Sequence, residues 1–250
     1  MQRTRADDRA QVRPRSARDT TTGRACSDPD SGAGARAPYD DDGADPHGAR
    51  AARAASNQNR AVVDALIGTL ATGARADYIG EPVSQLDHAL QAAALARAAR
   101  ASDAEVLAAL LHDIGHLCAP VDAPRMAAVG VSDHERTGAA YLTELGFGRD
   151  VTDLVSGHVA AKRYLVTTRP SYRSRLSSAS LATLLHQGGP MTADERAAFE
   201  RDPARDAMLR VRAWDEAAKT PGLTVPGLES YRTLLEAHLA RRAADARCDS

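Results

Sequence analysis

Apolar residues recur at helical spacing along most of this chain. In the segment RAVVDALIGTLAT, which begins at Arg60, they return every three or four positions, the period of a helix with one buried face. The same period is seen in VSQLDHALQAAALARAAR, RDVTDLVSGHVAAKRYL, SASLATLLHQ and PARDAMLRVRAWDEAAK, and a last helix is expected after Pro226. The alternation of apolar and polar residues that is typical of strands does not persist anywhere. The pattern therefore predicts an all-α fold.

Capping residues mark several of the expected helix ends. Ser102, Ser132 and Thr192 are each followed three residues later by a glutamate, an arrangement in which the two side chains cap the first turn of a helix. Gly146 is expected to end the helix that follows Ser132, and Gly157 to interrupt or end the helix that contains it. These signals divide the apolar pattern into separate helices.

The apolar pattern does not extend to the ends of the chain. From Met1 to about Ala55 there is no Leu, Ile, Phe or Trp, and the stretch is rich in Arg, Asp, Gly and Pro. Such a segment cannot bury enough apolar surface to offset the entropy lost on ordering. We expect a disordered leader over residues 1–56, one helical domain over 57–242 and a flexible C-terminal tail over 243–250.

Composition excludes some classes of partner. The formal net charge of −1 gives no general attraction to nucleic acid or to an anionic membrane, and no apolar run approaches the roughly 18–20 residues of a membrane span. The three cysteines, Cys26, Cys118 and Cys248, are scattered without CxxC spacing, which favours a reducing compartment. The sequence predicts a cytoplasmic protein without nucleic-acid or membrane partners and indicates no oligomeric state.

The segment AALLHDIGHL, Ala108 to Leu117, carries polar residues where apolar ones are expected. It reads as one buried helix in which His112 and His116, four residues apart, share a face. Asp113 lies among leucines and isoleucine, where an ionised carboxylate is costly unless it is paired or bound to a cation. A buried histidine alone indicates no more than a satisfied core residue, but the aspartate beside it points to a metal site.

Further histidines and a carboxylate lie on other predicted helices. A helical bundle can bring such side chains together from facing helices into a metal site. Four histidines and two aspartates provide enough donors for two metal ions with one shared carboxylate, and this mixed set favours iron or manganese over structural zinc. The candidate ligands are His88, His112, Asp113, His134, His158 and Asp215.

These residues carry a resemblance to a known family. The order His88, His112–Asp113, Asp215 resembles the H…HD…D pattern of the HD-domain superfamily, all-α metal-dependent phosphohydrolases, and His134 and His158 match the extra positions of its dinuclear members. The motifs YIGEPVSQLDHALQAA, GHVAAKRYL, LSSASLATLLHQGGPM and RAWDEAAK are similar to the 2-amino-1-hydroxyethylphosphonate dioxygenase family, mixed-valent diiron oxygenases related to myo-inositol oxygenase. The resemblance covers roughly residues 57–232.

The resemblance implies an HD-domain helical bundle around a dinuclear site. The six candidate ligands would hold two iron ions, Fe(II) and Fe(III), with Asp113 as the bridge and O₂ as co-substrate. Tyr78 and Glu81 would form a lid, in which the tyrosine occupies an iron position until substrate displaces it and the glutamate moves.

The resemblance also implies residues around the substrate. Lys162, four residues after His158 on a helix, would bind a phosphonate oxygen, although an ordinary surface lysine is the alternative. His116 would donate a hydrogen bond to the phosphonate or support His112, and Ser180 would either lie near the phosphonate or cap a helix. Gln187 and Gln85 are weaker candidates.

The function implied is O₂-dependent cleavage of the carbon–phosphorus bond of a small organophosphonate. A 1-hydroxyphosphonate such as 2-amino-1-hydroxyethylphosphonate would give a carboxylate, here glycine, and phosphate. A trimethylated substrate would favour aromatic neighbours, for which Tyr164 and Tyr172 are candidates. The alternative is an HD-type phosphohydrolase of a nucleotide or phosphomonoester, which shares the ligands. A degenerate HD domain with a regulatory role is disfavoured because all six ligand positions are kept.

Overall fold

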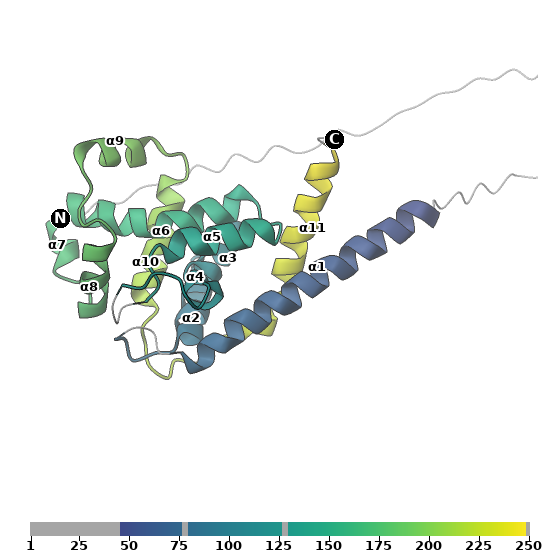
Figure 1. The fold of residues 1–250 in the computed structure, drawn as a ribbon, viewed down its shortest axis with the longest axis horizontal. Helices are drawn as coiled ribbons and strands as arrows, with labels where there is room; N and C mark the ends of the chain where they lie inside the picture. The colour runs from purple at the N-terminus through teal and green to yellow at the C-terminus, as the bar shows by residue number, and fades with distance from the viewer. Residues whose placement is uncertain (1–45, 77–79, 127–129, 249–250) are drawn as a thin grey trace, which may run out of the picture. The chain divides into compact units, whose positions relative to one another are not determined.

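The computed structural model describes residues 46–76, 80–126 and 130–248 (Figure 1). Within these ranges the regular elements are helices, and Arg125 and Val131 form an isolated antiparallel bridge. The all-α prediction is confirmed. The α-helices are α1 (Pro46–Thr72), α2 (Gln85–Ala98), α3 (Asp103–Leu111), α4 (Gly115–Cys118), α5 (His134–Glu144), α6 (Arg149–Thr168), α7 (Pro170–Arg173), α8 (Ser178–His186), α9 (Ala193–Arg201), α10 (Arg205–Ala217) and α11 (Arg232–Cys248), with 3₁₀ turns η1 (Gly73–Arg75) and η2 (Leu228–Tyr231).

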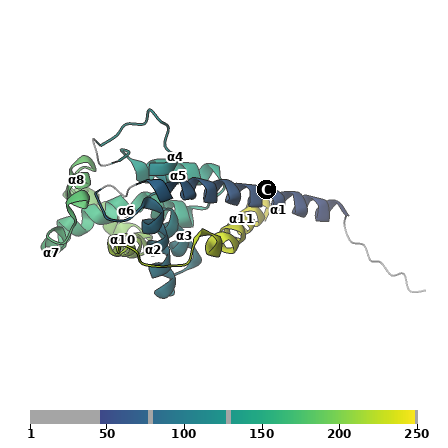
Figure 2. The ribbon, with the colours of Figure 1, turned by 90° about the horizontal axis from the view of Figure 1, so that it is seen from below.

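Helix α3 lies at the centre of the helical core. It packs against α2, α6 and α10, and α6 packs in turn on α5 and α10. Leu107, Leu110 and Leu111 of α3 are completely or almost completely buried, which explains why this segment is apolar on every side. Helices α1 and α11, from the two ends of the described chain, pack against each other (Figure 2). No helix within the described ranges combines the length and the apolar character needed to cross a membrane.

Helical structure extends beyond the domain bounds of 57–242 that we predicted. Helix α1 begins at Pro46, so residues 46–56 are helical rather than disordered, and α11 continues through residues 243–248 of the predicted tail. Both extensions are rich in alanine and arginine, which have high helix propensity even without an apolar face to bury. The rest of the predicted leader, residues 1–45, lies outside the described residues.

Two of the three predicted capping boxes are present. Ser102 and Thr192 each accept a hydrogen bond from the backbone of the glutamate three residues on, and that glutamate bonds back to the backbone of the capping residue. The box at Ser132 is wrong: α5 begins at His134, and the residue before it, Asp133, has a φ of 52° and caps nothing with its side chain. The reason is that the Ser132 N–H donates to the carbonyl of Pro124, which holds Ser132 outside the helix.

Gly157 does not interrupt its helix. Helix α6 is continuous from Arg149 to Thr168. A Cβ atom at Gly157 would lie 2.4 Å from the sulfur of Met208 on α10, so the glycine allows α6 and α10 to approach closely. The predicted break is wrong because the glycine serves helix packing rather than a turn.

The segment AALLHDIGHL is not one helix. Helix α3 ends at Leu111, a tight turn follows in which the Ile114 N–H donates to the carbonyl of Leu111, and α4 begins at Gly115. A Cβ atom at Gly115 would lie 1.9 Å from the carbonyl oxygen of His134, so α4 and the start of α5 touch through their backbones. The prediction that His112 and His116 share a face of one helix is therefore wrong. Because the turn separates the two helices, His112 and His116 do not follow the spacing of a single helix.

Candidate metal centre

Two pairs of buried histidines face one another in the core. The Nε2 atoms of His88 on α2 and His112 at the end of α3 are 3.0 Å apart. The Nε2 atoms of His134 on α5 and His158 on α6 are 3.2 Å apart. All four side chains are almost completely buried. Four different helices, α2 and α3 for one pair and α5 and α6 for the other, thus direct imidazole nitrogens to one place.

The hydrogen bonds of these histidines leave lone pairs facing each other. The Nδ1 atoms of His88, His112 and His158 each lie between 2.7 and 2.9 Å from a backbone carbonyl oxygen. A carbonyl only accepts, so each Nδ1 carries the proton and each neutral Nε2 presents a lone pair. Two lone pairs at such a distance repel unless a proton or a cation lies beside both. Fixing Nδ1 on a carbonyl is also how proteins orient metal-binding histidines.

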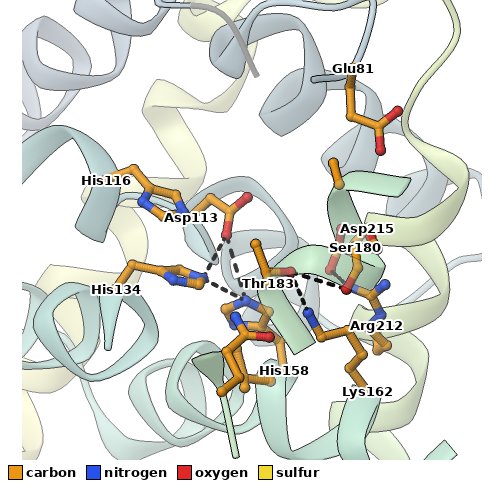
Figure 3. Close-up of a pocket in the computed structure, with 13 residues that line it drawn as sticks. Glu81, Asp113, His116, His134, His158, Lys162, Ser180, Thr183, Arg212 and Asp215 are labelled. Carbon is orange, nitrogen blue, oxygen red and sulfur yellow. Dashed lines mark hydrogen bonds and ion pairs between the residues drawn. The ribbon is translucent and has the colours of Figure 1, made fainter. Parts of the chain in front are cut away.

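Asp113 is shared between the two pairs. Its Oδ2 lies 3.3 Å from Nε2 of His112 and 3.7 Å from Nε2 of His88, whereas its Oδ1 lies 3.2 Å from Nε2 of His134 and 3.5 Å from Nε2 of His158. One oxygen of the same carboxylate therefore faces each pair. Figure 3 shows the oxygen that faces His134 and His158. This is the arrangement that a bridge between two metal ions requires.

Asp215 on α10 adds a second carboxylate beside the first pair. Its Oδ1 lies 3.4 Å from Nε2 of His88 and 3.8 Å from Nε2 of His112, and this buried oxygen has no hydrogen-bond donor among the described residues. Its Oδ2 is held by the guanidinium of Arg212. An orphaned buried carboxylate oxygen aimed at two imidazole lone pairs fits a metal ligand.

The two carboxylates of the site are held in the ionised form that a metal ligand needs. Burial disfavours the ionised carboxyl groups, yet the neighbouring cationic and hydrogen-bonding groups, chiefly His112 for Asp113 and Arg212 for Asp215, hold both pKa values well below their usual range. Burial also opposes protonation of His112, but the two carboxylates raise the pKa of His112 to about 9. A proton therefore competes with a cation here, and metal binding should strengthen as the pH rises.

The donor set fits a dinuclear metal cofactor. The six predicted ligands are brought together, and two donor groups that share Asp113 each place their ligand atoms within 4.8 Å of one another. Imidazole and carboxylate ligands without a thiolate suit iron, manganese or zinc, and facing helices of a bundle are a common frame for two such ions.

A cavity of about 40 Å³ lies next to the centre. Its walls hold acidic, basic and hydroxyl groups from helices that are distant in sequence (Figure 3). The described residues that line it are Glu81, Asp113, His116, His134, His158, Val159, Lys162, Ala179, Ser180, Thr183, Gln187, Arg212 and Asp215.

His116 lines this cavity without pointing a lone pair at the centre. Its Nδ1 accepts a hydrogen bond from the backbone N–H of Val131 at 3.2 Å, so the proton of the neutral ring is on Nε2. The ring stacks on His134 with 4.0 Å between centroids, and burial lowers the pKa of His116 to about 3. His116 is thus a neutral hydrogen-bond donor beside the ligand His134.

Lys162 is buried in the cavity wall and is not a surface residue. Its side chain is 3% exposed, and its Nζ donates a hydrogen bond of 2.9 Å to Oγ1 of Thr183. Burial, together with the nearby Arg212 guanidinium, lowers the pKa of Lys162 to about 7. An ammonium group in this position is poorly neutralised and would gain from an anion in the cavity.

Of the other residues that we predicted for the substrate site, some line the cavity and others do not. Glu81, Ser180 and Gln187 line the cavity. Gln85 does not line the cavity, and Tyr78 lies outside the described residues.

The two tyrosines considered for an ammonium cage do not line the cavity. The hydroxyl of Tyr164 donates to Glu200, and its ring packs on Phe199. The hydroxyl of Tyr172 accepts from Arg212 and donates to Glu216. Both tyrosines support neighbouring helices.

Sequence reasoning missed three residues near the site. Arg212 precedes Asp215 by three residues on α10, Thr183 follows Ser180 by three on α8, and Lys219 follows Asp215 by four. Helical spacing from a predicted site residue was the available signal for Arg212 and Thr183, whereas Lys219 lies after the end of α10 at Ala217. The cavity wall brings together side chains from α6, α8 and α10, and this arrangement is not visible in the sequence.

The His134→Ala variant should lose one of the two metal ions while the His88–His112 side of the centre keeps the other. The Nε2 of His134 lies beside Asp113 and His158, so its removal leaves the first pair and Asp215 in place. Metal analysis of the purified protein checks this, with the exposed His186→Ala as matched control. Unchanged metal content in His134→Ala would contradict the assignment of two separate ion positions.

Comparison with known proteins gives consistent matches. The HD domain family model matches residues 86–179. An uncharacterised protein of Acanthamoeba polyphaga mimivirus is 41% identical over 165 residues, which cover 66% of this chain and 75% of the relative. The 1-hydroxy-2-(trimethylamino)ethylphosphonate dioxygenase (glycine-betaine-forming) of Leisingera caerulea is 40% identical over 160 residues, 64% of this chain and 81% of the relative. The hydroxymethylphosphonate dioxygenase of Gimesia maris is 42% identical over 163 residues, 65% and 81% of the two chains.

Proposed function

We propose that this chain, which belongs to the family of HD-domain phosphonate dioxygenases, uses two iron ions and O₂ to cleave the carbon–phosphorus bond of a 1-hydroxyphosphonate. The protein is an oxygenase. The observation that carries the finer proposal is that two histidine pairs share Asp113 at one wall of a cavity whose other wall holds a buried ammonium group. The first feature suits a diiron centre, and the second suits an anionic substrate.

The cavity offers groups that recognise a phosphonate. Lys162 supplies a point charge, and the hydroxyls of Ser180 and Thr183 line the same wall. The Nε2–H of His116 adds a neutral donor on the side nearer His134. Charge-assisted hydrogen bonds of this kind would fix the phosphonate so that its hydroxyl-bearing carbon lies toward Asp113.

When bound, the iron ions supply the redox chemistry with O₂. His88, His112 and Asp215 would hold one ion, His134 and His158 the other, and Asp113 both. Arg212 keeps one oxygen of Asp215 occupied and leaves the other free for a metal. For 2-amino-1-hydroxyethylphosphonate the products would be glycine and phosphate. The three scattered cysteines favour a reducing compartment, so the cytoplasm stays the predicted location.

Oxygen dependence separates this proposal from the phosphohydrolase alternative. The protein is purified without O₂, loaded with iron, and given hydroxymethylphosphonate, 2-amino-1-hydroxyethylphosphonate or a phosphomonoester such as p-nitrophenyl phosphate. We expect phosphate release from at least one hydroxyphosphonate only after O₂ is admitted. Release that is equally fast without O₂, or that occurs with the phosphomonoester alone, would support a hydrolase and refute the proposal.

The Lys162→Ala variant should bind the substrate more weakly. Loss of a hydrogen bond to a charged group costs about 1.5–3 kcal/mol, which corresponds to a rise of about tenfold to a hundredfold in the dissociation constant. Metal content should not change, since the hydrogen bond that Lys162 donates goes to Thr183 and its cationic group is not a metal ligand. Titration with phosphonate under anaerobic conditions measures this, with the exposed Arg173→Ala as a control for loss of a cation. Equal affinity in wild type and Lys162→Ala would remove Lys162 from the substrate site.

A further inference from the structure

The Nδ1 atom of His134 differs from those of the other three histidines of the centre. The Nδ1 atoms of His88, His112 and His158 each lie close to a backbone carbonyl oxygen. The Nδ1 of His134 is buried and has no hydrogen-bond partner among the described residues. Since Nε2 of His134 faces Asp113, the neutral ring must carry its proton on Nδ1 when Nε2 holds a metal ion. A buried N–H without an acceptor is costly, so this atom calls for a partner.

A buried carboxylate oxygen with the same deficit lies beside it. Oε2 of Glu135 is 3.6 Å from Nδ1 of His134, and it too has no hydrogen-bond partner among the described residues. Glu135 is 9% exposed, and it does not form the capping box with Ser132 that the sequence pattern predicts. A hydrogen bond requires the two atoms to approach by about 0.5 Å, a distance that rotation of the Glu135 side chain can supply. The two unsatisfied atoms thus point to one shared interaction.

Glu135 is placed to support a metal ligand rather than to be one. The donor group on this side of the centre consists of Asp113, His134 and His158, without Glu135. The carboxylate of Glu135 approaches the ring at Nδ1, whereas Asp113 and His158 lie beside Nε2. The ring itself stacks on His116 with 4.0 Å between centroids (Figure 3). Glu135 can therefore act on an ion here through the imidazole of His134.

Negative charge is distributed unequally between the two ion positions. Among the described residues, Asp215 faces the first histidine pair, so an ion there has a carboxylate in addition to the shared Asp113. An ion beside His134 and His158 has Asp113 alone. A carboxylate bonded to Nδ1 of His134 would add negative charge next to this second position without taking up a ligand position.

We infer that Glu135 is a positioning residue that acts through His134 and stabilises Fe(III) over Fe(II) at the position held by His134 and His158. A carboxylate that accepts a hydrogen bond from an imidazole raises the basicity of the ring, and it does so more than a neutral carbonyl because the bond is charge-assisted. The nearby negative charge also favours the more highly charged ion. The inference rests on the proposed function, which supplies the two iron ions, and goes beyond it by assigning a redox role to a residue outside the ligand set.

Replacement of Glu135 by glutamine tests this, because glutamine keeps an oxygen acceptor and removes the charge. The mixed-valent Fe(II)/Fe(III) pair of Glu135→Gln should be reduced to the diferrous state more readily than that of wild type. We expect the preference for Fe(III) to fall about tenfold, which corresponds to a rise of about 59 mV in the one-electron potential. Anaerobic redox titration followed by EPR spectroscopy measures this. The matched control is Glu144→Gln, an exposed glutamate at the other end of α5, which should leave the potential unchanged.

The potential separates this role from a merely structural one. Glu135 also lies in the first turn of α5, where an acidic residue stabilises a helix. Loss of that effect alone would lower the free energy of unfolding and leave the potential of the iron pair unchanged. An unchanged potential in a Glu135→Gln protein that binds two iron ions would therefore overturn the inference.

A crystal structure of the iron-loaded wild type provides a second test that requires no variant. Nδ1 of His134 should lie within about 3.2 Å of a Glu135 oxygen, and a different acceptor on Nδ1 would overturn the inference. Neither measurement depends on turnover. Absence of O₂-dependent phosphate release from every hydroxyphosphonate would refute the proposed reaction, while the potential and the structure would still decide the role of Glu135.

Discussion

The Asp113→Asn variant is expected to lose both metal ions and all O₂-dependent phosphate release. Among the described residues, Asp113 is the one carboxylate that faces both histidine pairs, with Oδ2 toward His112 and Oδ1 toward His134. Asparagine keeps the shape but removes the negative charge and offers one oxygen in place of two. Loss of several kcal/mol of metal binding corresponds to a fall in affinity of about a thousandfold or more.

Metal analysis and anaerobic iron titration measure this effect. The matched control is Asp122→Asn, the same substitution at an exposed aspartate nine positions further along the chain, which should keep its metal and its activity. If Asp113→Asn binds iron as wild type does, Asp113 is not the bridge, and the two histidine pairs do not form one centre.

The Gly115→Ala variant is expected to destabilise the fold and to disturb the second histidine pair. The added Cβ would lie 1.9 Å from the carbonyl oxygen of His134 and 2.9 Å from the backbone nitrogen of Gly138, and neither backbone atom can rotate away. Helix α5 would have to move away from α4. We expect the free energy of unfolding to fall by about 3 kcal/mol or more, beyond the usual cost of overpacking a core.

A second glycine provides the control for this substitution. Gly68 is exposed within α1, and a Cβ atom there meets nothing within 4 Å. Gly68→Ala should therefore stabilise the protein by about 0.5–1 kcal/mol through helix propensity. Thermal and denaturant unfolding of both variants, together with metal content, checks the pair. A Gly115→Ala protein as stable as wild type would show that the contact between α4 and α5 is looser than described.

Much of the fold and of the metal centre was predictable from the sequence, because their signals are local. Helical spacing of apolar residues is read within one segment, and an aspartate such as Asp113 among leucines is anomalous whatever surrounds it. The six candidate ligands could be picked out as polar residues on otherwise apolar helices. The choice of Asp113 as the shared carboxylate, however, was expected only through the resemblance.

The features that escaped prediction depend on contacts between distant segments. Nothing near Gly115 in the sequence reveals that the backbone of His134 lies against it, so the break between α3 and α4 was missed. Gly157 leaves its helix unbroken and contacts Met208, which is fifty-one positions further along the chain, so the local sequence alone wrongly predicts a helix break there. Lys219 likewise forms an ion pair with Glu81, which lies in a distant loop before α2, and nothing near Lys219 in the sequence indicates this contact.

Iron titration of the metal-free protein, with O₂ consumption and phosphate release recorded together, tests the central claim most directly. We predict that activity on a 1-hydroxyphosphonate rises until about two iron ions are bound per chain, and that about one O₂ is consumed for each phosphate released. Full activity with one iron ion per chain, or phosphate release without O₂ consumption, would contradict a dinuclear oxygenase centre built on Asp113.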